Sequence, residues 1–168
     1  MYSAIIQHRR DEWPDLSGLA HHTVSKCERI VQIFKETSDK ERGLDSGMRN
    51  ILRDMRAFLR FSEEKLETAK DAISTMNRKS LLSDMERELI INWGVAVDKV
   101  KKDVFQEDLE GGDKKDQELF DEIEEIFEDG DALEIYAAFN HLKDAAQNYE
   151  SSLAEEINSI VSRFKFYS

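Results

Sequence analysis

Residues 48–76, MRNILRDMRAFLRFSEEKLETAKDAISTM, decide the fold class of this chain of 168 residues. Nine positions recur there at alternating spacings of four and three residues: Met48, Leu52, Met55, Leu59, Ser62, Leu66, Ala69, Ile73 and Met76. A heptad repeat of this length is typical of a long helix that packs lengthwise against another helix. Ile51 and Phe58 widen this seam, which favours a bundle over an isolated two-stranded coiled coil.

Apolar residues also recur every three or four positions in most of the remaining chain, so further helices are expected there. The expected ranges are 16–34, 48–76, a third helix that begins at 80–83 and is broken at 110–113, then 119–127 and 131–164. Ser83 and Glu86 have the spacing of a capping box, as do Asp131 and Glu134. We therefore predict an all-α fold: an elongated bundle of about five helices, several of them long, in a single domain over 1–168.

Composition excludes several classes of protein. Seven Gly and one Pro are too few for a β-sandwich, a barrel or a loop-rich fold. One Cys excludes a disulfide framework and a cysteine-based metal site. The longest apolar run, Ile135 to Phe139, is too short to span a bilayer. Residues 1–10 lack the ordered regions of a secretory signal, so we expect a soluble, cytoplasmic protein.

The net charge of −12 comes from one part of the chain. Residues 103–134, the acidic segment, contain 15 acidic and two basic residues, which gives −13; the other 136 residues contain 21 acidic and 22 basic ones, which gives +1. Two interpretations remain open. The segment is either a solvated linker and helix face, or a docking surface for a basic partner that includes the possibility of nucleic-acid mimicry.

Four arginines form the opposite feature. Arg49, Arg53, Arg56 and Arg60 repeat at spacings of 4, 3 and 4, one position after the seam, and form an arginine stripe roughly 16 Å long at ~1.5 Å per residue. Arginine favours planar, bidentate contact with phosphate or carboxylate. Either the stripe pairs with acidic residues of a neighbouring helix or of the acidic segment, or it tracks the phosphates of a single-stranded nucleic acid.

No catalytic or metal-binding group assembles from the sequence. His21 and His22 are adjacent, so on a helix they point about 100° apart and do not chelate together. Cys27 falls on the apolar face of its helix, as expected of a core residue rather than a nucleophile. We therefore expect no enzyme activity, no metal, no cofactor and no small-molecule substrate.

Two short motifs suggest a family. The chain carries Leu44-Asp-Ser-Gly-Met-Arg-Asn-Ile-Leu52 at the start of the second helix and ends with Arg163-Phe-Lys-Phe-Tyr-Ser168. The first resembles the Thr/Ser-Ser-x-Leu-Arg-Asn/Lys-Leu pattern that opens a long helix in the small helical subunit of type III CRISPR effector complexes, of the Csm kind. The tail is similar to the aromatic Tyr-x-Lys-Phe-Tyr tail of that family.

This resemblance covers about a tenth of the chain, and the acidic segment departs from it. It implies a non-catalytic subunit that stacks in copies along an RNA-guided complex. It also implies that Arg49 and its neighbours touch the guide–target duplex or the displaced strand. Other protein subunits, copies of the chain itself and RNA are the partners that follow from it.

A second hypothesis gives the acidic segment the main role. The chain is then an acidic helical inhibitor, immunity protein or chaperone that binds a basic protein. The interface residues on this hypothesis are Glu122, Glu125 and Glu128, with Phe120 and Phe127 as apolar anchors. A plain homo-oligomeric bundle is a third possibility, because heptads encode packing without specifying the partner helix.

Overall fold

The computed structural model describes residues 16–39, 46–75, 81–107, 116–128 and 132–167. They form five helices: α2 (Leu16–Asp39), α3 (Ser46–Ser74), α4 (Leu81–Asp103), α5 (Asp116–Glu128) and α6 (Leu133–Tyr167). No strand occurs in these ranges, so the prediction of an all-α fold with several long helices is confirmed. The seam residue Met76 and the capping-box residue Asp131 lie outside the described residues.

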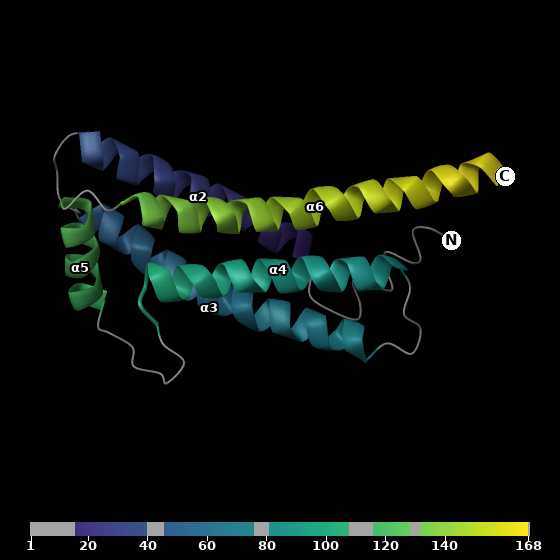
Figure 1. Cartoon of the computed structure of the whole chain (residues 1–168), viewed down its shortest axis with the longest axis horizontal. Helices are drawn as coiled ribbons and strands as arrows, with labels where there is room; N and C mark the ends of the chain where they lie inside the picture. The colour runs from purple at the N-terminus through teal and green to yellow at the C-terminus, as the bar shows by residue number, and fades with distance from the viewer. Residues whose placement is uncertain (1–15, 40–45, 76–80, 108–115, 129–131, 168) are drawn as a thin grey trace.

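The four long helices form an antiparallel bundle. Consecutive long helices alternate in direction, and α5 lies across one end of the bundle (Figure 1). Helix α2 packs against α3 and α6, and α4 packs against α3 and α6, so the four helices enclose a common core. This is the up-down-up-down arrangement that short connections favour.

The core follows the predicted seam. Every seam residue of α3 that the structure describes is buried, from Met48 to Ile73. Ser62 is a small member of the seam whose hydroxyl donates to the carbonyl oxygen of Phe58 at 2.8 Å. One cluster of buried apolar side chains includes residues from all five helices. At about 25 cal/mol per Å² of buried apolar surface, this cluster is the main source of stability.

The capping box predicted at Ser83 is wrong. Helix α4 already begins at Leu81, so Ser83 lies inside its first turn, and both Ser83 and Glu86 are buried. The Glu86 carboxylate accepts a hydrogen bond from the Tyr149 hydroxyl at 2.9 Å, which links α4 to α6. A buried carboxylate needs such a partner, and tertiary packing therefore determines the role of this residue.

Helix α4 also ends earlier than predicted, at Asp103 rather than near 109. Gln106 has a φ of 53°, and the Glu107 amide donates to the Lys101 carbonyl oxygen at 2.9 Å. Glycine usually supplies the left-handed residue of a C-terminal cap, and here Gln106 does so, while the bond from Glu107 reaches a carbonyl six residues back. The cap reverses the chain and brings Glu107 back toward α3.

The last part of α6 differs from the rest of the bundle. Helix α6 extends past the ends of α2 and α4 (Figure 1). After Tyr149, none of its described side chains is buried, although Leu153, Ile157 and Val161 are half-buried. None of the helices that the structure describes has both the length and the apolar character required to cross a membrane.

Candidate functional site

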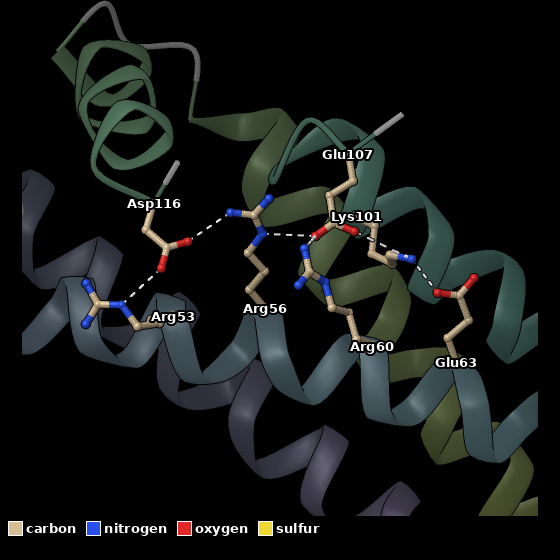
Figure 2. Close-up of polar contacts among 7 residues, drawn as sticks. All are labelled: Arg53, Arg56, Arg60, Glu63, Lys101, Glu107 and Asp116. Carbon is tan, nitrogen blue, oxygen red and sulfur yellow. Dashed lines mark hydrogen bonds and ion pairs between the residues drawn. The ribbon is translucent and has the colours of Figure 1, made fainter. Parts of the chain in front are cut away.

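The arginine stripe lies on the side of α3 that faces the end of α4 and the start of α5, and it is fully engaged with carboxylates. The Arg53 Nε donates to Asp116 at 3.1 Å, and the Arg56 Nη1 donates to the other oxygen of Asp116 at 2.9 Å. On the opposite side, the Arg56 Nε and the Arg60 Nη2 both donate to one oxygen of Glu107, at 2.9 and 3.0 Å (Figure 2). Each carboxylate therefore bridges two arginines that are about one helical turn apart.

Arg49 extends this arrangement along α5. Its Nη2 contacts Asp121 at 2.8 Å and Glu124 at 3.0 Å, both on α5. All four residues of the stripe thus pair with the acidic segment. Of the two interpretations that the sequence left open, the structure shows the intramolecular one, and contact of the stripe with nucleic acid stays a prediction.

The centre of the network is a buried ion pair. The Arg56 and Glu107 side chains are only 7% and 8% exposed. Lys101 also approaches Glu107, at 3.5 Å, and pairs with Glu63 of α3. Buried charges need this kind of multiple pairing, because removal from water costs several kcal/mol per ion.

The pairing raises the pKa of Arg49, Arg56 and Lys101. Burial lowers the pKa of Arg56, but its hydrogen bonds to Glu107 and Asp116 outweigh burial, so that the pKa lies above the usual value. Burial likewise lowers the pKa of Lys101, and its contacts with Glu63 and Glu107 raise it above the usual value. For Arg49 the hydrogen bond to Asp121 is the largest effect, and it raises the pKa. Arg49, Arg56 and Lys101 therefore stay protonated at physiological pH.

The stripe is not uniformly covered. The side chains of Arg53 and Arg60 are 54% and 49% exposed, whereas that of Arg49 is 24% exposed. The Arg53 guanidinium also lies 5.9 Å from the centre of the Phe120 ring, within range of a cation–π contact. Arg53 and Arg60 can therefore meet an external anion without any opening of the bundle, and Arg56 cannot.

The structure corrects the predicted interface for a basic protein partner. Phe120 is 1% exposed and belongs to the core with Leu119 and Ile123, so it does not act as an external anchor. The physical reason is that α5 turns its apolar face toward the bundle. Glu125 is exposed and Glu122 is half-buried, while the side chains of Phe127 and Glu128 lie outside the described set.

Sequence reasoning missed Glu63 and Lys101 of the network, and it included Glu107, Asp116, Asp121 and Glu124 only as unnamed members of the acidic segment. The sequence does indicate that Arg56 is at least half-buried, because Leu52 and Leu59 of the seam, four residues before it and three residues after it, lie on the same side of the helix. A buried arginine requires a carboxylate. The identity of that carboxylate depends on the cap at Gln106, which sequence periodicity does not reveal.

No catalytic centre is apparent among these groups. Cys27 is buried, and burial raises the pKa of its thiol to about 12, so it is not a nucleophile at neutral pH. Within the described ranges, no three His, Cys, Asp or Glu side chains form a group that could hold a metal ion. The expectations of no enzyme activity and no cofactor stay predictions.

Comparison with known proteins adds no family to these observations. No protein-family profile, no curated protein and no solved structure matches the chain significantly. The fold and the site define the chain as an antiparallel four-helix bundle that an internal arginine–carboxylate network joins to a fifth, transverse helix.

Proposed function

We propose that this chain is a non-catalytic helical subunit of an RNA-guided effector complex of the type III CRISPR kind, and that it contacts the RNA backbone through the arginine stripe of α3. One observation carries the proposal. Four guanidinium groups in register along α3 each hold carboxylate oxygens at 2.8 to 3.1 Å. Phosphate oxygens suit the same donors, because arginine binds carboxylate and phosphate with similar geometry.

The exposure of the stripe supports this proposal over the acidic inhibitor. Arg53 and Arg60 are half-exposed, so an external strand can reach them. Of the two apolar anchors that the inhibitor requires, Phe120 is instead packed inside the chain and is 1% exposed. The resemblance of residues 44–52 to the small subunit of type III complexes points to the same helix.

The exposed side of α6 supports contact with neighbouring protein subunits. Leu153, Ile157 and Val161 are half-buried and recur every four residues along α6 after Tyr149, and Leu153 packs against the core of the bundle. Rows of this kind at helical spacing are typical of helix-to-helix contact. We infer that neighbouring subunits of the complex, copies of this chain included, pack on this row.

The proposal is tested by a pull-down of the tagged chain from its source cell at low salt. We expect short RNAs of uniform length and a set of basic proteins to co-purify. The variant Arg53→Gln/Arg60→Gln should recover clearly less RNA, because it removes the two accessible donors and leaves buried Arg56 intact. The matched variant Lys35→Gln/Lys99→Gln removes two exposed cations away from the stripe and should retain the RNA. Equal RNA recovery from both variants would contradict the proposal.

A further inference from the structure

The carboxylates of α5 occupy the positions on α3 where an RNA backbone would bind. We propose that α5 is an internal latch, whose Asp116, Asp121 and Glu124 imitate a row of phosphates and compete with RNA for the arginine stripe. This inference rests on the proposed function, and it adds regulation to the same site. The inference requires three properties of α5. Its carboxylates must fit the positions of the arginines, they must neutralise the positive charge of the stripe, and α5 must separate from the bundle more easily than the other helices do.

The match is geometric. Asp116 uses one oxygen for Arg53 and the other for Arg56, as a phosphate with two free oxygens would do. Asp121 and Glu124 then converge on Arg49, further along the stripe. The acidic face of α5 thus supplies anionic oxygens to three consecutive arginines of one helix. Charge-assisted contacts of this kind are stronger than neutral hydrogen bonds.

The latch also neutralises the site. Five cations, Arg49, Arg53, Arg56, Arg60 and Lys101, meet five carboxylates, Glu63, Glu107, Asp116, Asp121 and Glu124, so the described network has no net charge. A neutral surface does not attract a polyanion over a distance. Withdrawal of the three α5 carboxylates leaves a net charge of +3, which favours association with RNA.

Helix α5 is the element that opens most easily. It has 13 residues, whereas the other four helices have 23 to 35. Its described contribution to the buried core is Leu119, Phe120 and Ile123. A helix this short is marginal in water by itself, and local opening begins at the elements with the least apolar burial. Glu107 is not on α5, so Arg56 retains its buried partner when the latch opens.

The experiment measures binding of the full chain to a fluorescein-labelled single-stranded RNA of about 20 nucleotides, a length that exceeds a typical single-strand site. The latch variant is Asp116→Asn/Asp121→Asn, in which both side chains keep their size. The matched control is Glu118→Gln/Glu125→Gln, which removes two exposed charges from the same helix outside the network. At low salt we expect the latch variant to bind RNA about fivefold more tightly than the control does, because displaced carboxylates no longer compete.

Hydrogen exchange of the unmodified chain provides a second measurement that does not depend on a variant. We expect the amides of 116–128 to exchange faster in the presence of the RNA, while those of α4 and α6 stay unchanged. Equal affinities of latch variant and control, or unchanged exchange in α5 at saturating RNA, would overturn the latch. Absence of RNA binding by the unmodified chain and by both variants would instead overturn the proposed function itself.

Discussion

Arg56 lies at the boundary between the core of α3 and the polar network, and its burial makes it the residue on which the network depends most. Its guanidinium joins Glu107 and Asp116, which belong to different elements. The seam indicated where Arg56 would lie on the helix, because Arg56 is flanked by buried Leu52 and Leu59. The sequence did not reveal its partners. Spacing along one helix indicates the side of the helix on which a residue lies, but it does not indicate which residues of other elements face that side.

The Arg56–Glu107 pair should contribute measurably to stability. We expect Arg56→Met to lower the free energy of unfolding by about 3 kcal/mol, because Glu107 is then left buried with fewer cations. The double variant Arg56→Met/Glu107→Leu should lose clearly less than the sum of the two single variants. Urea unfolding of all four proteins measures this coupling. Additive losses would show that the two side chains do not stabilise each other.

Arg53 provides the comparison within the same stripe. Its side chain is half-exposed, so its ion pair with Asp116 is screened by water. We expect Arg53→Gln to change the free energy of unfolding by less than about 1 kcal/mol. A loss as large as that of Arg56→Met would contradict the assignment of Arg56 as the structural member of the stripe.

Cys27 should be inert at neutral pH. Burial raises the pKa of its thiol to about 12, so the folded chain keeps the proton while the unfolded chain releases it near pH 9. The folded state then binds more protons, and stability should fall by up to about 1.4 kcal/mol per pH unit above about pH 9. The raised pKa of Lys101 acts in the same direction, because its stabilising charge is lost as the pH rises.

Two measurements check this behaviour. A thiol reagent at pH near 8 should modify Cys27 far more slowly in buffer than in denaturant. The variant Cys27→Ala should show a smaller loss of stability between about pH 8 and about pH 10 than the unmodified chain. Rapid modification of the folded protein, or identical alkaline losses in both proteins, would contradict the burial of this thiol.

At the scale of the elements, the long helices were predictable and their ends were not. The heptad of α3 extends over eight turns and each described seam residue is buried, since a long periodic pattern outweighs local exceptions. Helix α4 ends at Asp103, and three residues later a non-glycine residue, Gln106, adopts the left-handed conformation. The usual glycine signal of such a cap is absent, so the sequence indicated Gly111-Gly112 instead.

The cap at Gln106 yields a test of the end of α4. Gln106→Val should lower the free energy of unfolding by about 2 kcal/mol, because a β-branched side chain is strained at positive φ. Gln106→Gly should be tolerated, since glycine adopts this conformation without cost. Chemical denaturation of both variants measures the difference. Equal stability of the Gly and Val variants would contradict the left-handed cap.

Helix α5 shows that an amphipathic pattern does not determine which surface covers the apolar face of a helix. The sequence indicated one apolar and one acidic face, and this pattern fits a helix that binds an external partner as well as one that packs on its own bundle. The structure shows the second arrangement, with Phe120 in the core and Asp121 on Arg49. Periodicity along a helix does not distinguish the two, because it contains no information on which surface covers the apolar face.

At the scale of the whole molecule, the fold brings the two charged features of the sequence into contact. The acidic segment and the arginine stripe were separate features of the sequence, 43 or more residues apart between Arg60 and Asp103. The antiparallel bundle brings them together at one end, where α5 crosses it (Figure 1). In this arrangement Arg53 and Arg60 are half-exposed, while carboxylates of α5 pair with part of the stripe. The exposure is the basis of the proposed RNA contact, and the pairing is the basis of the proposed latch.

The salt dependence of RNA binding tests the central claim most directly. If the four arginines of the stripe reach phosphates of a single strand after α5 has moved away from them, the slope of log K against log salt concentration should be about −3. Arg53→Gln/Arg60→Gln should reduce its magnitude to about half, whereas Lys35→Gln/Lys99→Gln should leave it unchanged. An identical slope for all three proteins would contradict the claim that the stripe of α3 binds the RNA backbone.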